Sequence, residues 1–198
     1  EGARVDLGRR ALRDAPGWAV SSSRRRTLGC VRPCGIATAL DGIGREHRHL
    51  GPPLSGLAAW EAYSVSGWPV GWLLVGRPVA RVLQADGWVE VTRCATTGRC
   101  WGAASELYRT AERWAAERGS PILTYTLASE RGGSLEAAGW VRVGVTRGGQ
   151  FVCKVRPGAA IRQGEIAAPK VRWMPEALHL IAVARGWGPP CITRQDGL

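Results

Sequence analysis

The turn over residues 99–104 carries the residues best suited to bind an anion. Its sequence, RCWGAA, spaces Arg99, Gly102 and Ala104 as RxxGxA, directly before a run with helical periodicity. The first backbone N–H groups of a helix have no partner inside that helix, and small side chains let a phosphate approach them. Arg99 can add a guanidinium to the same phosphate. We therefore predict a pyrophosphate site here, and the alternative is a Gly/Ala helix start that only packs against a sheet.

A second candidate group is the sequence His47-Arg48-His49. Two imidazoles separated by one residue can act as acid and base, orient a substrate or supply two metal ligands. Cys30 and Cys34 lie upstream, but their spacing to these histidines is not a dependable zinc pattern. From these residues alone a site role without a metal and a metal ion at His47 and His49 both stay open. An exposed basic helix end, stabilised by the helix dipole, would have the same sequence.

Three arginines and a glutamate are expected near one end of the sheet. Arg77 and Arg81 flank Pro78 on an expected strand, and Arg93 ends another. Their guanidinium groups suit a phosphate or a base edge, or they are solvated and paired with nearby acids. Glu90 lies between two valines, so it is either the partner of one of these arginines or a general base with a raised pKa. We favour the pairing.

The hydrophobic pattern predicts an α+β layout built on one mixed sheet. The residues between 89 and 144 read as strand, turn, long amphipathic helix (about 102–118) and strand (121–129), which is a βαβ unit. Before it, a strand and a helix ending near residue 45 precede three strands of a meander. The expected strands outside the βαβ unit are 27–33, 56–64, 69–83, 140–147 and 150–156, and a short helix is expected over 132–140.

Composition gives the domain limits and the compartment. We expect a loosely ordered basic extension over residues 1–26, one domain over 27–156, and a C-terminal extension over 157–198 with one or two helical turns near residue 180. The six cysteines are sparse and irregularly spaced, which indicates reduced thiols in a cytoplasm rather than a disulfide framework. No apolar run is long enough to span a membrane, and the charged start does not resemble a secretory signal.

The charge balance is strongly one-sided. Lys and Arg number 27 against 16 Asp and Glu, which gives a formal net charge of +11. All but two of these basic residues are arginines, whose guanidinium forks suit phosphates and base edges. A GC-rich genome would also favour arginine codons, but it would not by itself produce the net charge. The sequence therefore favours a polyanionic partner.

The order of elements and the RxxGxA turn resemble the GNAT acyltransferase fold, in which this turn holds the pyrophosphate arm of acetyl-coenzyme A. Four segments resemble more specifically a phage and prophage family of GNAT-related proteins grouped with the Mom DNA-modification protein, which converts adenine in DNA to a carbamoylmethyl form. These segments are GRPVAR (76–81), EVTR (90–93), SELY (105–108) and TYTLASERGGSLEAAGW (124–140). The HRH sequence before a Pro-Pro pair also fits, and the resemblance covers roughly residues 47–148.

The resemblance implies a site for each substrate. An acyl-CoA, acetyl-CoA or a related donor, would contact the phosphate turn and the strand before it. An acceptor would be contacted from the basic segments, and the resemblance places the acyl group where two parallel strands part. The implied cofactor contacts are Ala95, Thr96, Arg99, Gly102, Ala103, Ala104 and Ser105; the implied acceptor or nucleic-acid contacts are Arg48, Arg77, Arg81, Arg93, Ser129 and Glu130.

The implied chemistry is the transfer of an acyl-type group to an amine. His47, His49 or Glu90 would take a proton from the attacking nitrogen. Tyr125 would return one to the departing thiolate or would simply pack, and Ser134 would approach the thioester sulfur or cap the short helix.

Three functions remain open from the sequence. The leading hypothesis is a Mom-like transferase that modifies the amino group of adenine in phage or host DNA, in a bacterial or phage-infected cytoplasm. The second is a non-catalytic nucleic-acid-binding protein on the same fold, which the bulky Cys100 and Trp101 in the phosphate turn favour slightly. The third is an N-acetyltransferase of small molecules or proteins, which does not require so much positive charge.

Overall fold

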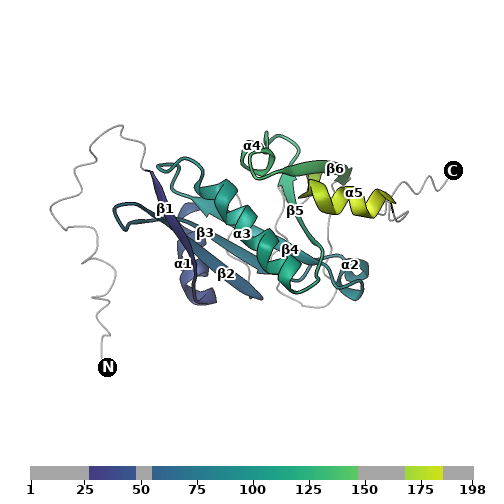
Figure 1. Cartoon of the computed structure of the whole chain (residues 1–198), viewed down its shortest axis with the longest axis horizontal. Coiled ribbons are helices and arrows are strands. Elements are labelled where there is room, and N and C mark those ends of the chain that lie inside the picture. Colours follow the sequence, from purple (N-terminus) through teal and green to yellow (C-terminus); the bar gives the residue numbers. More distant parts are fainter. Residues whose placement is uncertain (1–26, 48–54, 147–167, 185–198) are drawn as a thin grey trace, which may run out of the picture.

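The structure, a computed structural model, describes residues 27–47, 55–146 and 168–184. Within these residues a seven-stranded mixed sheet carries helices on both faces (Figure 1). The strands are β1 (Leu28–Pro33), β2 (Ala58–Ser64), β3 (Pro69–Gly76), β4 (Val89–Thr96), β5 (Ile122–Leu127), β6 (Trp140–Thr146) and β7 (Lys170–Pro175). The helices are α1 (Ile36–Glu46), α2 (Arg81–Ala85), α3 (Ala103–Glu117), α4 (Gly133–Glu136) and α5 (Glu176–Ala184).

The strand order in the sheet is β1-β2-β3-β4-β5-β7-β6. Every neighbouring pair is antiparallel except β4 and β5, which run parallel. Parallel neighbours need a crossover connection, and α3 supplies it between these two strands. The sequence-predicted βαβ unit and the α+β class are therefore confirmed.

Each face of the sheet has its own apolar core. On one face the stripe of α3, including Leu107, Ala111 and Ala115, packs on Leu73 and Val75 of β3 in the larger buried cluster. On the other face α1 packs on the alternate residues of the same strand in a smaller cluster of Ala39, Ile43, Ala59, Trp72, Leu74 and Ala95. Successive residues of a strand point to opposite faces, so a central strand such as β3 must be apolar throughout.

Two expectations about the elements were wrong. The strand expected over 69–83 ends at Gly76, because Pro78 offers no N–H to a ladder, and Arg81 begins helix α2 instead. Residues 170–175, expected in an extension, form β7 between β5 and β6, so the domain boundary at residue 156 cuts off a strand of the sheet. The strand expected over 150–156 and the extension over 1–26 lie outside the described residues.

Two further findings concern the cysteines and the helices. Cys30, Cys34, Cys94 and Cys100 are free thiols, and the other two cysteines lie outside the described residues. None of the helices in the described ranges is long and apolar enough to cross a bilayer.

The contact between α1 and the sheet gives a test of the fold. A Cβ at Gly42 would lie 2.3 Å from the indole of Trp72, so Gly42→Ala should lower the free energy of unfolding by about 1–3 kcal/mol despite the better helix propensity of alanine. Gly44→Ala, at an exposed position of the same helix, should leave stability unchanged or raise it by up to about 1 kcal/mol. Urea unfolding of both variants measures this, and equal effects would contradict the packing.

Candidate functional site

The two parallel strands part soon after they begin. β4 and β5 pair only at Val89↔Ile122, Glu90↔Leu123 and Val91↔Thr124. Next, Leu74 of β3 pairs with Arg93 and Val75 with Val91, so Thr92 is an extra residue in β4. Such a bulge bends a strand. Beyond Val91 and Thr124 the strands are no longer bonded to each other, and we call this point the fork.

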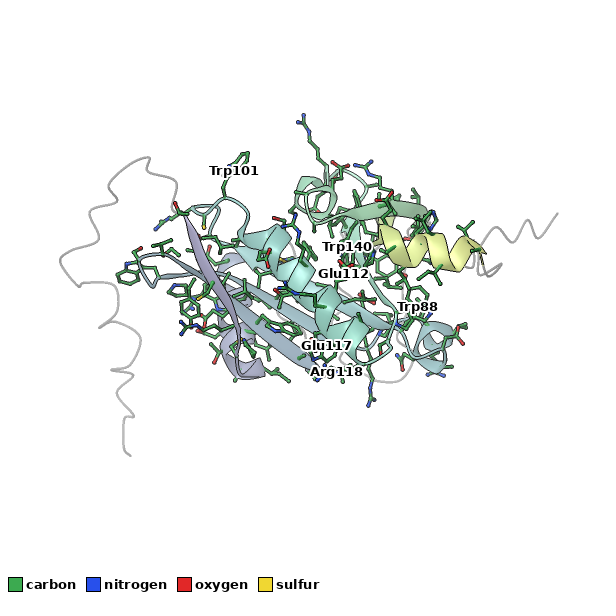
Figure 2. The ribbon with its side chains drawn as sticks, viewed as in Figure 1. Trp88, Trp101, Glu112, Glu117, Arg118 and Trp140 are labelled. Atoms are coloured by element: carbon green, nitrogen blue, oxygen red, sulfur yellow. The ribbon has the colours of Figure 1, made fainter. Side chains whose placement is uncertain are left out.

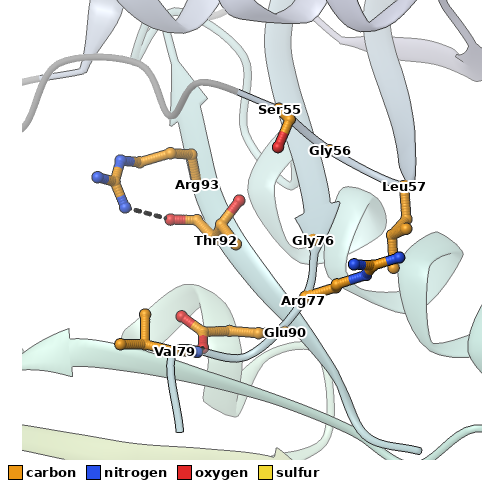
Figure 3. A pocket seen from close by; sticks show the side chains of 9 residues that line it. All are labelled: Ser55, Gly56, Leu57, Gly76, Arg77, Val79, Glu90, Thr92 and Arg93. Carbon is orange, nitrogen blue, oxygen red and sulfur yellow. Dashed lines mark hydrogen bonds between the residues drawn. The ribbon is translucent and has the colours of Figure 1, made fainter. Parts of the chain in front are cut away.

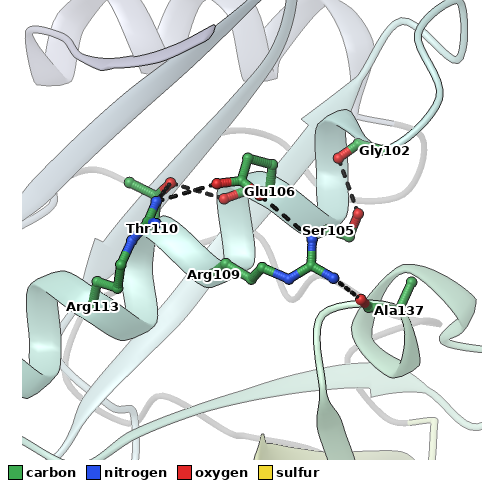
Figure 4. Close-up of polar contacts among 7 residues, drawn as sticks. All are labelled: Gly102, Ser105, Glu106, Arg109, Thr110, Arg113 and Ala137. Atoms are coloured by element: carbon green, nitrogen blue, oxygen red, sulfur yellow. Dashed lines mark hydrogen bonds and ion pairs between the residues drawn. The ribbon is translucent and has the colours of Figure 1, made fainter.

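The start of α3 lies at the end of the diverging β4. Gly102 is the N-cap residue with a φ of 79°, a conformation that favours glycine. Its carbonyl accepts bonds from the Ser105 hydroxyl at 3.0 Å and the Glu106 N–H at 2.9 Å (Figure 4). The N–H groups of Ala103, Ala104 and Ser105 belong to the first turn, which leaves them without intrahelical acceptors. This geometry is suited to an anion.

The bulky residues of the turn do not fill the space beside Gly102. Cys100 is buried in the core under α3, whereas Trp101 is 74% exposed and projects away from the ribbon (Figure 2). Among the described residues other than its two chain neighbours, only the Ser105 hydroxyl lies within 4 Å of a Cβ built on Gly102, at 4.0 Å. Cys100 therefore does not crowd this glycine, and the Trp101 side chain is turned to solvent.

The sequence-predicted cofactor contacts divide by exposure. Arg99 and Gly102 are exposed, and Ala104 and Thr96 are partly exposed. Ala95 packs in the core under α1, and Ala103 is completely buried, so both can offer only backbone groups. Ser105 is buried and its hydroxyl bonds to Gly102, so the prediction that this hydroxyl reaches a phosphate does not fit the structure.

A pocket of about 540 Å³ opens beside the fork (Figure 3). It brings together three predicted residues, Glu90, Arg77 and Arg93, from β4 and the segment after β3. The residues lining it are Ser55, Gly56, Leu57, Gly76, Arg77, Val79, Glu90, Thr92 and Arg93. Among the described residues, one carboxylate and two guanidinium-bearing side chains thus line the same pocket, and the acceptor-binding role predicted for Arg77 and Arg93 is compatible with this position.

Glu90 is the buried acid of this pocket, at 8% exposure. Burial raises its pKa to about 7, opposed by the Val79 N–H bond and by the charges of Lys170 and Arg93. The N–H of Val79 donates to Oε2 at 3.4 Å. Within the part of the chain that the structure describes, Glu90 forms no ion pair, so the favoured pairing with an arginine is wrong there. The raised pKa fits the alternative, a general base.

Tyr125 lies on the same face of the sheet as Glu90. Ile122 packs in the core under α3, so Tyr125, three residues along β5, points to the opposite face. Burial raises its pKa; the Arg172 charge opposes this shift and the Glu90 charge adds to it. Tyr125 and Glu90 thus lie on one face of the sheet, on the neighbouring strands β5 and β4.

The remaining predicted residues stand apart from the pocket lining. Ser129 and Glu130 are exposed in the turn after β5, where Glu130 accepts the Leu127 N–H at 3.2 Å. Gly132 is the N-cap of α4, so the capping role expected for Ser134 is wrong. Arg81 is exposed in α2 and is not among the described residues that line the pocket.

The histidine segment is described only in part. His47 ends α1, and its N–H donates to the carbonyl of Ile43 at 2.8 Å. It is not among the described residues that line the pocket, and Arg48 and His49 lie outside the described residues. No cluster of three or more metal-ligating side chains occurs in residues 27–47, 55–146 and 168–184.

Sequence reasoning missed two basic residues of the site. Lys170 and Arg172 come from β7, and both influence the groups at the fork through their charge. The only signal was a short alternation, in which apolar Val171 and Trp173 follow Lys170 and Arg172 in turn, and four residues of alternation are too few to identify a strand.

Solved structures of acetyltransferases share this architecture. An acetyltransferase of Bacillus subtilis in complex with CoA matches over 75% of this chain and 97% of its own, with 13% identity and a TM-score of 0.50. The NatB acetyltransferase complex bound to a bisubstrate inhibitor matches over 75% and 92%, with 12% identity and a TM-score of 0.51. Nourseothricin acetyltransferase matches over 60% of this chain at 15% identity and a TM-score of 0.42, and the match spans 64% of its length.

These likenesses show the fold. The chain has the GNAT acetyltransferase fold, with a mixed sheet flanked by helices, which confirms the expected fold class. No protein-family model matches the sequence, and no curated protein matches it.

The raised pKa of Glu90 predicts a pH-dependent loss of stability. The folded state keeps the proton up to about pH 7, whereas the unfolded chain releases it near the ordinary value of 4.5. Stability should therefore fall by about 3 kcal/mol as pH rises from 4.5 to 7, and Glu90→Gln should lack this fall. Chemical unfolding from pH 4 to 8 measures the difference between the two proteins. Glu117→Gln on α3 controls for the loss of one exposed carboxylate, and parallel pH curves for wild type and Glu90→Gln would refute the burial argument.

Proposed function

We propose that the protein transfers an acyl group from an acyl-CoA to an amine. The observation that carries this proposal is the fork, which lies between an open helix start and a buried acid with a raised pKa. The same fold occurs in acetyltransferases solved with CoA or a bisubstrate inhibitor. A helix start, a gap between strands and a proton acceptor are the three parts that such a transfer needs.

The residues of the turn fit the pyrophosphate of the donor. The N–H groups of the first turn of α3 would bind the phosphate oxygens, and Arg99 would add a guanidinium. Divergence of β4 from β5 frees the backbone groups that would otherwise pair the two strands. An acyl-CoA, acetyl-CoA or a related donor, supplies the activated carbonyl that the acceptor attacks.

Glu90 would act as the proton acceptor on the other side of the fork. A carboxylate with a pKa of about 7 is substantially ionised at neutral pH and still basic enough to accept a proton. The amine nitrogen bonds to the carbonyl carbon and its proton passes to Glu90 Oε. The carbon–sulfur bond then breaks, and Tyr125, on the same face, returns a proton to the thiolate. Its raised pKa keeps this hydroxyl protonated and able to donate.

A charge placed at the helix start tests the donor site. Ala104→Glu puts a carboxylate in the first turn of α3, where the helix dipole tolerates it but the phosphates of acetyl-CoA are repelled. We expect at least a tenfold weaker affinity for acetyl-CoA with the fold retained. Ala116→Glu makes the same charge change at an exposed position near the other end of α3. Isothermal titration measures both, and equal affinities in the two variants would contradict the site.

We further propose that the acceptor is an amino group of a nucleobase, the adenine of phage or host DNA. The net charge of +11 and the two arginines beside Glu90 support a polyanionic acceptor. An adenine amino group inside a duplex is stacked and out of reach, so the base would have to flip into the pocket. Arg77 and Arg93 would then contact the flanking phosphates.

Mass spectrometry of nucleosides tests this acceptor. DNA from cells that express the protein should contain a new modified adenine, and DNA from cells that express Glu90→Gln should contain at least tenfold less. The variant is the control for modification by the host. Unmodified DNA together with tight acetyl-CoA binding would instead favour an N-acetyltransferase of small molecules or proteins, and salt-sensitive DNA binding without acetyl-CoA binding would favour a non-catalytic DNA-binding protein.

A further inference from the structure

Arg172 is a buried cation without a complete set of partners. It is 8% exposed, and its Nε has no hydrogen-bond partner within the described residues. None of the described carboxylates forms an ion pair with it, although its guanidinium carbon lies 5.7 Å from the centre of the Tyr125 ring. A buried charge without an opposite charge costs several kcal/mol. Arg172 therefore lowers the free energy of unfolding unless an anion binds to its guanidinium group.

The side chain of Arg172 belongs to the same sheet face as the proposed proton acceptor. Val171 and Trp173 pack in the core under α3, so Arg172 points to the opposite face. Glu90 does the same, since Val89 and Val91 also pack under α3. Arg172 pairs with Tyr125 across β5 and β7.

Glu90 and Arg172 lie on either side of β5. Because β5 separates β4 from β7 in the sheet and parts from β4 beyond Thr124, the two backbones are at least two strand spacings, or about 10 Å, apart. Lys170 lies two residues before Arg172, and its charge reaches Glu90. An amine bound at Glu90 would thus have the positively charged side chains of Lys170 and Arg172 on its β7 side.

We infer that Arg172, assisted by Lys170, binds an anionic group of the acceptor, a phosphate or a carboxylate carried near the reacting amine. This inference rests on the proposed function, because the molecule that carries the anionic group is the acceptor of the proposed transfer. The anion site itself does not require acyl transfer. A guanidinium binds either oxyanion with two parallel hydrogen bonds. Its position makes Arg172 a specificity-determining residue that is distinct from Arg77 and Arg93, which line the pocket on the β3 side.

Thermal unfolding with inorganic phosphate or acetate tests the site. Saturating coenzyme A is present in every sample, so that the start of α3 is filled, and sodium chloride keeps the ionic strength constant. We expect each anion to raise the Tm of the wild type by several degrees and to leave the Tm of Arg172→Met unchanged. A response to phosphate alone would indicate a phosphoryl group on the acceptor, and a response to both would include carboxylates.

Arg142→Met is the matched control. Arg142 is exposed on β6, where its guanidinium lies 4.9 Å from the Trp173 ring on the other face of the sheet, so this variant should keep the full anion response. Without anions, Arg172→Met should melt at the same temperature as the wild type or about 2–4 °C higher, because the uncompensated buried charge is gone. Should Arg172→Met fail to fold, Arg172→Lys replaces it, with an anion affinity about tenfold weaker.

The outcomes separate this inference from the proposed function. No anion response in the wild type, or a full response in Arg172→Met or Arg172→Lys, would overturn the anion site. Absence of any acetyl-CoA binding would overturn the proposed function and leave the anion site standing.

Discussion

The parting of β4 and β5 is the constraint on which the rest of the site depends. The parallel pairing extends over three residues of each strand. At its last pair, Val91 and Thr124, the Thr124 hydroxyl donates a hydrogen bond to the Val91 carbonyl at 2.8 Å. The extra residue Thr92 then bends β4, while β5 turns to β7 for its hydrogen bonds. One bulge therefore directs β4 toward the start of α3 and leaves a gap on its β5 side.

Burial gives the acceptor side its electrostatic character. Among the described residues that line the pocket, Glu90 is the one acid. Four basic residues either line the pocket or act on the groups at the fork: Arg77, Arg93, Lys170 and Arg172. In a low-dielectric setting the desolvation of Glu90 outweighs the attraction of these cations, which is why its pKa is raised rather than lowered. Arg172 is buried and forms no ion pair within the described residues, and the anionic group of an acceptor would neutralise its charge.

The sequence predicted the elements whose pattern is local and regular. α3 follows from its apolar stripe and its Gly102 start, and the RxxGxA turn has the geometry expected of it. α2 was mistaken for a strand because Arg81–Ala85 is short and follows an apolar run. β7 was missed because its alternation of polar and apolar residues lasts for only four residues, Lys170 to Trp173. The ionic partner expected for Glu90 could not be judged from the sequence, since pairing depends on side-chain positions in three strands.

The donor half of the site could be predicted from the sequence better than the acceptor half, because the two halves are built from the chain in different ways. The donor half is contiguous: β4, the turn and α3 follow each other over residues 89–117, so a short motif contains most of its geometry. The acceptor half is assembled from the segment before β2, the segment after β3, and the strands β4, β5 and β7. These parts are spread over more than half of the chain. Its specificity arises from strand pairing, above all from the insertion of β7 beside β5. That insertion places Arg172 opposite Tyr125. Because β7 follows the donor turn by about 70 residues in the sequence, a motif around that turn cannot include Arg172.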